Sequence, residues 1–354
     1  GLIKLVDSIT PIIILPIIIS RIGLEFYGQL VFFISLNNIY RMIINYGIET
    51  YGIKEYNSRS PASIFATAIS IQSINTFLII ICLLFLFDSG EKVLSILMAL
   101  IPFSELFRLK WLGQGSLSFK KLLTSSLIRT IILILLFSLV LSSTNYKSTY
   151  PLMFIFANFC ASIPFWYWIS QNFKQILYSL KWPDIIAAYR RNFLYLKTNL
   201  YGAFNNEATV FTLQLNGDSI LIGIYDLFRK VIEVGKIPNS LINTFMFPFI
   251  AKTKNLVLAN KVNLLRTIIA FSIYFTINIL FSYIYNFLTE EIITSNIQNS
   301  FWIMSSLIII TSSSYYTGNT LLVNFGFEHN YKSSILYGMI FNLVTMVLLY
   351  CLKE

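Results

Sequence analysis

The chain has 354 residues, of which 56% are hydrophobic and only 12% are charged. Because a soluble globular domain carries about 25% charged residues, this composition excludes an ordinary soluble protein and indicates a polytopic membrane protein. The net charge is +10. Its basic residues stand in short segments between apolar runs, which is the pattern that sets membrane topology, so we expect no nucleic acid among the partners.

Apolar runs predict eleven membrane spans, since one span needs about 20 apolar residues. In chain order they cover residues 2–20, 29–50, 62–87, 92–110, 119–142, 150–170, 195–216, 219–250, 265–288, 299–323 and 333–351. Prolines are expected to kink two of them: Pro11 and Pro16 the first, Pro238 and Pro248 the over-long eighth. No strand-type alternation interrupts the runs, so the predicted fold class is all-α.

The distribution of lysine and arginine predicts the orientation. With the N-terminus inside, most of the 26 basic residues fall on the cytoplasmic side and few on the outer side. The longest connection, 171–194, is basic and amphipathic and includes Trp182, so we expect a cytoplasmic surface linker. It would join an N-terminal six-helix bundle, 1–170, to a C-terminal five-helix bundle, 195–354.

An internal repeat relates these two bundles. Gly28 is followed thirteen residues later by Arg41, and Gly223 is followed thirteen residues later by Lys236, in similar apolar surroundings. The segment from Trp111 (WLGQG) likewise resembles the segment from Tyr316 (YTGNT). The repeat predicts two pseudo-symmetric bundles on a twelve-helix plan that lacks its last helix, through truncation or real shortening. We also expect residues ahead of Gly1, because the chain does not begin with methionine.

Two matched cations are the strongest functional signal. A charge at the centre of a membrane helix costs about 2.5–3.5 kcal/mol, yet Arg41 and Lys236 both stand in mid-span. They are expected to line a cationic cavity for an anionic substrate between the two halves. Arg129 and Arg229 are further candidates, although Arg229 and its neighbour Lys230 lie nearer the outer end, where snorkelling is the alternative.

Polar side chains near these cations have two interpretations each. Asn37 and Asn38 precede Arg41 by one turn and would bind sugar or join helices. The remaining candidates are the carboxylates Glu207, Glu233 and Asp7, which are expected to couple transport to protons or Na⁺ or to act as charge partners. For Glu207 the expected partner is Arg41 or Lys236; for Glu233 it is Lys236, three residues later.

The sequence has no P-loop, metal-binding cluster or nucleophile motif, so we expect no cofactor and no enzymatic activity. Transport would draw on an ion gradient, the membrane potential or consumption of the product.

Three segments resemble polysaccharide flippases of the Wzx type, in the multidrug/oligosaccharidyl-lipid/polysaccharide exporter superfamily. They are LPIIISRIGLEFYGQL (15–30), WLGQG (111–115) and the segment 222–252, which contains IGIYDLFRK and a late Phe-Pro. The resemblance implies a flippase in the bacterial cytoplasmic (inner) membrane that works by alternating access. Its cargo would be an undecaprenyl-diphosphate-linked oligosaccharide, an O-antigen or capsule repeat unit. Other membrane proteins of polysaccharide assembly are implied as partners.

Two alternatives remain open. A drug or small-molecule cation antiporter of the same superfamily predicts an acidic, aromatic cavity, whereas the matched central charges here are basic. A membrane polysaccharide polymerase or ligase usually places its chemistry in a sizeable outer loop, and the predicted outer loops are short.

Overall fold

The computed structural model describes residues 2–56, 58–142, 144–289 and 293–314, with a few isolated positions from 316 to 345. Within these residues the secondary structure is helical and contains no strand, which confirms the predicted all-α class. The predicted eleventh span and most of the repeat segment that starts at Tyr316 lie outside the described residues.

The first half of the chain forms nine α-helices and one 3₁₀ helix. In order they are α1 (Leu2–Ile22), α2 (Leu24–Asn45), α3 (Ile48–Glu55), α4 (Pro61–Leu86), α5 (Ser89–Glu105), η1 (Leu106–Arg108), α6 (Lys110–Gly115), α7 (Phe119–Val140), α8 (Tyr146–Ala161) and α9 (Ile163–Tyr178). The second half contributes α10 (Trp182–Leu215), α11 (Ser219–Thr253), α12 (Leu256–Thr289), α13 (Ser295–Ser305) and α14 (Leu307–Ser314).

Two predicted spans are interrupted where the backbone turns left-handed, and a third bends without such a residue. The second span, predicted over 29–50, stops at Asn45 because Tyr46 and Gly47 both have positive φ, 48° and 74°. The fourth, predicted over 92–110, is interrupted at Leu109, whose φ is 44°. The sixth divides into α8 and α9, which are bent by 66°. Conversely, α1 continues through Pro11 and Pro16, and α11 is one helix of 35 residues that includes Pro238.

The predicted linker, 171–194, is mostly helical. The helix α9 extends to Tyr178, and α10 begins at Trp182, so only residues 179–181 connect the two helices. The seventh span, predicted from residue 195, therefore starts about thirteen residues earlier than expected.

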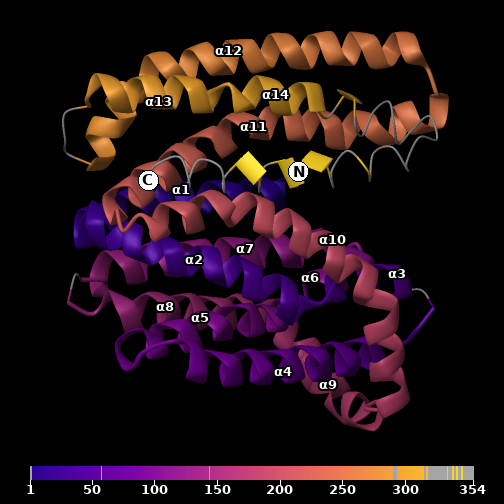
Figure 1. Cartoon of the computed structure of the whole chain (residues 1–354). Coiled ribbons are helices and arrows are strands. Elements are labelled where there is room, and N and C mark those ends of the chain that lie inside the picture. Colours follow the sequence, from indigo (N-terminus) through magenta and orange to yellow (C-terminus); the bar gives the residue numbers. More distant parts are fainter. Residues whose placement is uncertain are drawn as a thin grey trace.

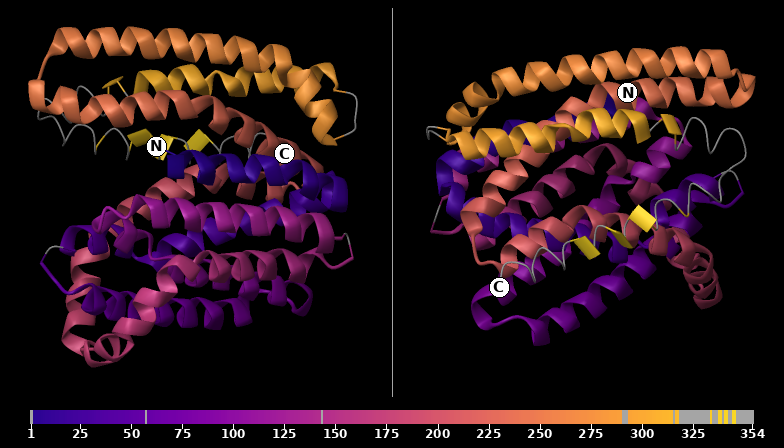
Figure 2. Two further views of the ribbon diagram at one scale, coloured as in Figure 1. Left: turned by 180° about the vertical axis from the view of Figure 1, so that it is seen from behind. Right: turned by 45° about the horizontal axis from the view of Figure 1, so that its top comes forward.

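The helices form layers in which α1 and α2 lie in the middle of the molecule (Figure 1). The helices α12, α13 and α14 lie along one edge, and α4, α5, α8 and α9 lie along the opposite edge; the reverse view gives the same arrangement (Figure 2). Between them, α2 contacts α10 and α11, and α1 contacts α7 on one side and α12 on the other. The helices α1 and α2 therefore connect the two parts of the molecule.

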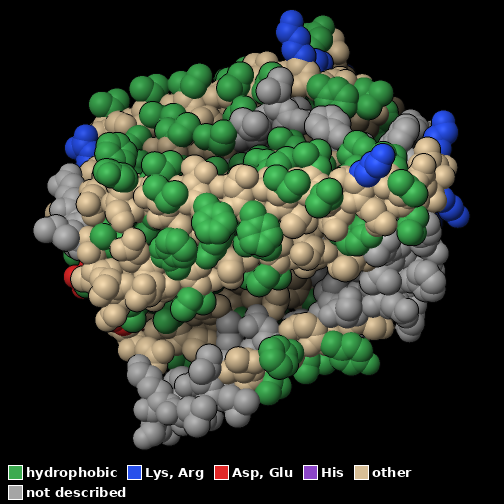
Figure 3. Space-filling model, turned by 90° about the horizontal axis from the view of Figure 1, so that it is seen from above, with side chains coloured by type: hydrophobic (Ala, Val, Ile, Leu, Met, Phe, Trp, Pro, Cys, Tyr) green, Lys and Arg blue, Asp and Glu red, His purple; other side chains and the backbone are tan. Residues whose placement is uncertain are grey.

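The outer surface is apolar where it would face lipid. On α7, Leu127, Ile131, Leu135 and Leu139 recur every four residues and are all exposed. Hydrophobic side chains also cover the face seen in Figure 3, with Lys and Arg near its margins. By length and composition, α4, α7 and α12 can each cross a bilayer, and the bent pair α8–α9 brings the number to four if it is counted as one span. These observations agree with a polytopic membrane protein.

Two glycines allow α2 and α11 to cross at very short range. A Cβ on Gly28 would lie 1.7 Å from the carbonyl oxygen of Ser219, and a Cβ on Gly223 would lie 2.9 Å from the carbonyl oxygen of Leu24. Gly28 and Gly223 are the two glycines matched by the repeat, and the structure places them against each other. Equivalent helices of the two halves thus meet near their N-terminal ends.

We expect Gly28→Ala to destabilise this crossing, because a methyl group there forces the backbones apart; overpacking typically costs about 1–3 kcal/mol. The matched control is Gly202→Ala on α10, where a Cβ meets nothing within 4 Å and alanine favours the helix by about 0.5–1 kcal/mol. Thermal unfolding of the purified protein in detergent is the measurement. Equal melting temperatures for both variants would show that the close crossing is not required.

Candidate functional site

Two clusters of buried charge lie along α2. The first, called the basic cluster, contains six side chains: Asp7, Arg41, Glu105, Arg108, Lys110 and Arg129. The second, called the balanced cluster, contains four: Glu207, Asp226, Arg229 and Lys230. Polar side chains that an apolar bundle encloses must find partners within the protein. The contacts within each cluster therefore show which charged groups the fold brings together.

Glu105, at the end of α5, joins two helices of the basic cluster. Its Oε2 lies 2.7 Å from Nη2 of Arg41 on α2, and its Oε1 lies 3.8 Å from Nη2 of Arg129 on α7. The carboxylate is only 12% exposed. The guanidinium of Arg129 also lies over the ring of Phe154, 5.5 Å from its centroid. One carboxylate therefore holds two cations from different helices.

Asp7 of α1 makes the second pair of contacts. Its carboxylate oxygens lie 3.7 Å from Nη2 of Arg108 and 3.6 Å from Nζ of Lys110. The left-handed residue Leu109 separates these two basic residues, ending the 3₁₀ turn and starting α6. This break lets both side chains reach the same carboxylate.

The basic cluster has more positive than negative charge. Its four cations and two carboxylates leave a formal charge of +2. Arg108 is almost fully buried, at 1% exposed. Its Nε and Nη1, together with Nε of Arg129, are buried and have no hydrogen-bond acceptor among the described residues. Buried guanidinium N–H groups without acceptors are costly, so the cluster is suited to receive an anion.

A very small pocket adjoins these side chains. It has a volume of about 20 Å³ and is lined by Arg41, Glu105 and Lys110, with the exposed Glu49 also among its lining residues. Such a space holds about one water molecule. A larger anion can enter only if the surrounding helices move apart.

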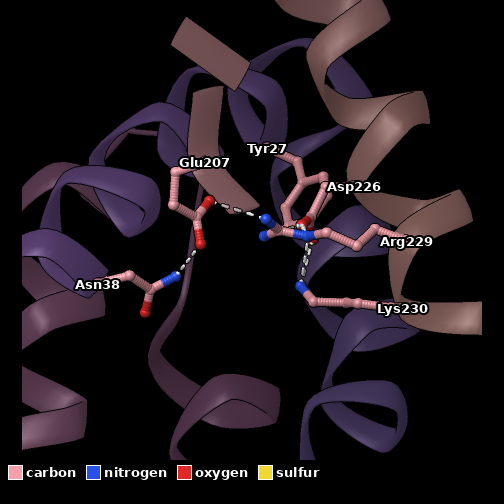
Figure 4. Close-up of polar contacts among 6 residues, drawn as sticks. All are labelled: Tyr27, Asn38, Glu207, Asp226, Arg229 and Lys230. Carbon is pink, nitrogen blue, oxygen red and sulfur yellow. Dashed lines mark hydrogen bonds and ion pairs between the residues drawn. The ribbon is translucent and has the colours of Figure 1, made fainter. Parts of the chain in front are cut away.

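The balanced cluster is built around Asp226 of α11, which is 1% exposed (Figure 4). One turn further along the same helix, Nη2 of Arg229 and Nζ of Lys230 lie 2.7 and 2.8 Å from its carboxylate. Tyr27 of α2 donates a hydrogen bond to Asp226 and accepts one of 2.6 Å from Lys230.

Glu207 of α10 completes the balanced cluster (Figure 4). Its Oε2 lies 2.7 Å from Nη1 of Arg229, and its Oε1 accepts a hydrogen bond of 2.8 Å from the side-chain amide of Asn38 on α2. The two carboxylates and two cations balance, so this cluster has no net formal charge.

The structure brings together some of the predicted residues and not others. Arg41, Arg129 and Asp7 share the basic cluster, while Arg229, Glu207 and Asn38 meet at the balanced cluster. Lys236 is half-buried and Glu233 is exposed; neither forms an ion pair with a described residue. Asn37 has a buried side-chain oxygen for which no described residue serves as donor.

Three expectations need correction. Glu207 pairs with Arg229 and not with Arg41 or Lys236. Arg229 and Lys230 do not snorkel, because Asp226 of the same helix binds both of them. Lys236 and Glu233 do not form the expected i,i+3 ion pair in the described part of the chain.

Sequence reasoning also missed several members of the two clusters. Asp226 precedes Arg229 and Lys230 by three and four residues, and this spacing on one helical face was the available signal. Arg108 and Lys110 look like loop residues at a cytoplasmic edge, and nothing in the sequence shows the left-handed Leu109 that directs them inward. Glu105 falls inside the predicted span 92–110, so a carboxylate within an apolar run was the available signal. Tyr27 has no signal of its own beyond its place in the segment 15–30.

The chain resembles a known protein in its fold and not in its sequence. No family model matches the sequence, and none of the curated proteins matches it. The arrangement of helices does have a match. The chain has a MATE-like fold. It superimposes on a multidrug resistance MATE family transporter of the MOP superfamily, solved in an inward-facing conformation, with a TM-score of 0.72 and 11% identity.

This match covers 95% of the present chain and 84% of the transporter. It confirms an all-α polytopic membrane fold. The flippases that the sequence resembles are members of the same superfamily, so a MATE-like fold agrees with that resemblance without distinguishing one member from another.

We expect Asp226→Asn to lower stability by about 3–5 kcal/mol, because it leaves a buried lysine and arginine without their shared carboxylate. Asp184→Asn is the matched control. Asp184 pairs with Arg59 at 3.3 Å with both side chains about 30% exposed, and such pairs contribute less than about 1 kcal/mol. Denaturant or thermal unfolding in detergent distinguishes the two, and equal losses would mean that the balanced cluster is not a structural requirement.

Proposed function

We propose that the protein is an alternating-access transporter that moves a lipid-linked oligosaccharide with a diphosphate headgroup from the inner to the outer leaflet of the bacterial cytoplasmic membrane. The observation that carries this proposal is the basic cluster. Its surplus of two positive charges and its buried guanidinium groups without acceptors suit a diphosphate, whose oxygens accept bidentate hydrogen bonds from arginine.

The geometry supports a headgroup site better than a site for the whole cargo. Arg41, Arg108, Lys110 and Arg129 come from four separate elements, so they surround a compact anion from several sides. The apolar outer faces of α7 and α12 offer lipid contact, where a prenyl tail would remain while the polar head crosses about 30 Å of hydrocarbon.

Cargo binding requires a conformational change. A space of about 20 Å³ beside Arg41 cannot contain a diphosphate, so helices around the basic cluster must part before the headgroup enters. All six members of the basic cluster belong to α1–α7 of the first half, so this opening requires helices to shift within that half as one half moves against the other. Coupling to H⁺ or Na⁺ remains part of the proposal, with Asp7 as the cluster's carboxylate on α1.

A second candidate function is cation antiport, favoured by the likeness to a multidrug resistance MATE transporter. A drug-like cation would seek an acidic cavity. Asp7 and Glu105 are acidic, but four cations already surround them. The excess of positive charge therefore favours the anionic cargo.

The decisive experiment is deletion of the gene in its native bacterium followed by complementation. We expect lipid-linked repeat units to accumulate on the inner leaflet and surface polysaccharide to fall. The wild-type gene should restore both, and Arg129→Gln or Arg41→Gln should restore them at least about tenfold less well, since one charge-assisted hydrogen bond contributes about 1.5–3 kcal/mol.

Arg190→Gln is the control, because Arg190 is an exposed cation on α10 outside both clusters. Membrane abundance is measured for every variant. Normal surface polysaccharide in the deletion strain together with altered drug sensitivity would reject the flippase and favour the antiporter. Full complementation by both arginine variants would reject the basic cluster as the headgroup site.

A further inference from the structure

We infer that Tyr27 and Asn38 form a latch that holds α2 against α10 and α11 and sets how readily the two halves separate. The inference rests on the proposed alternating movement but not on any particular cargo. The latch consists of these two neutral side chains and the hydrogen bonds that they make to the balanced cluster (Figure 4).

The placement of the two residues suits a latch. Eleven residues separate them, three helical turns, so they lie on one face of α2 about 16 Å apart. Leu30 and Val31 lie between them in the chain and are fully buried. The two polar contacts therefore stand apart along the seam between α2 and the second half, with buried apolar side chains between them.

Three charge-assisted hydrogen bonds make up the contact. The hydroxyl of Tyr27 donates to Asp226 and accepts from Lys230, and the amide of Asn38 donates to Glu207. Because each bond has one ionised partner, each is stronger than a bond between neutral groups. Breaking all three hydrogen bonds costs substantial free energy, and the bonds can form again when the helices come back together.

The charge balance explains why this contact can open. All four charged members of the balanced cluster belong to α10 and α11, and they compensate one another within that pair of helices. When α2 moves away, it takes only a phenol and an amide with it. Neither half then retains an unpaired charge, whereas separating an ion pair across the interface would leave one on each side.

The latch also lies next to the proposed headgroup site. Asn38 precedes Arg41 by three residues, so the two side chains lie on neighbouring parts of one helical face. Opening the contact between Asn38 and Glu207 would loosen the same stretch of α2 that carries Arg41 and its partner Glu105. Movement at the latch and access to the basic cluster are thus connected through one helix.

The test measures distances between the halves without any cargo. Spin labels replace Glu91 on α5 and Leu215 on α10, both exposed and near the ends where α2 and α11 begin. Cys82, Cys160 and Cys351 are first changed to serine. We expect Tyr27→Phe and Asn38→Ala each to raise the ratio of long to short distances at least about tenfold over the parent protein.

Tyr146→Phe is the matched control. The hydroxyl of Tyr146, on α8, donates a 2.8 Å hydrogen bond to Gln29 of α2. The substitution therefore removes the same chemical group as Tyr27→Phe, but from a contact inside the first half. This control should leave the distances unchanged. The inference is overturned if folded Tyr27→Phe and Asn38→Ala proteins keep the parent distribution, or if Tyr146→Phe shifts it equally. Should Tyr27→Phe fail to fold, Asn38→Ala alone decides.

Failure of this test and failure of the proposed function are separable. The distances are recorded in lipid nanodiscs with no substrate, so a negative complementation result does not alter them. Suppose that the distances do not change and that the complementation results are those expected for a flippase. That outcome would reject the latch and leave the proposed function standing.

Discussion

Compensation of buried charge is the constraint on which the rest of the structure depends. In an apolar helix bundle, an ionised side chain has no water to solvate it, and it must find a counter-charge or hydrogen bonds within the protein. The two clusters meet this requirement with ion pairs, and α2 contributes to both. The close glycine crossing with α11 and the contacts with α5 and α10 all bring polar groups of α2 within reach of their partners.

The two clusters solve the same problem differently. In the balanced cluster, two carboxylates match two cations within α10 and α11, so the charges stabilise a permanent pair of helices. In the basic cluster, Asp7 and Glu105 are too few for four cations, and guanidinium N–H groups remain without acceptors among the described residues. A fold that keeps such a surplus bears a cost that an anionic ligand would relieve. The surplus charge of the basic cluster therefore suits ligand binding, and the internal balance of the other cluster suits movement.

Much of the fold follows from the sequence because apolar runs of about 20 residues have few other structures available to them. The repeat pairs Gly28 with Gly223, and the structure places these two glycines in contact, where small residues let helices approach closely. The extension of that repeat to Arg41 and Lys236 was less informative. Arg41 joins a cluster, whereas no described residue pairs with Lys236. Equal spacing from the glycine fixes the depth and the helical face of each side chain, but not which neighbouring helices meet that face.

The remaining features depend on geometry that composition does not encode. The left-handed Leu109 places Arg108 and Lys110 beside Asp7, although both resemble ordinary loop cations. The pairing of Glu207 with Arg229 results from the packing of α10 on α11, which the prediction of separate spans left open. Helix ends at Asn45 and Trp182 likewise follow from local backbone conformation and tertiary contacts more than from hydropathy.

We propose that the basic cluster binds the diphosphate of a lipid-linked cargo. The most direct test measures equilibrium binding of a polyprenyl diphosphate to the purified protein in nanodiscs. Binding of the lipophilic cation tetraphenylphosphonium is measured separately for comparison. We expect saturable binding of the diphosphate, weakened at least about tenfold by Arg129→Gln, which corresponds to about 1.4 kcal/mol, and unaffected by Arg190→Gln. Saturable binding of the cation with none of the diphosphate would contradict this proposal.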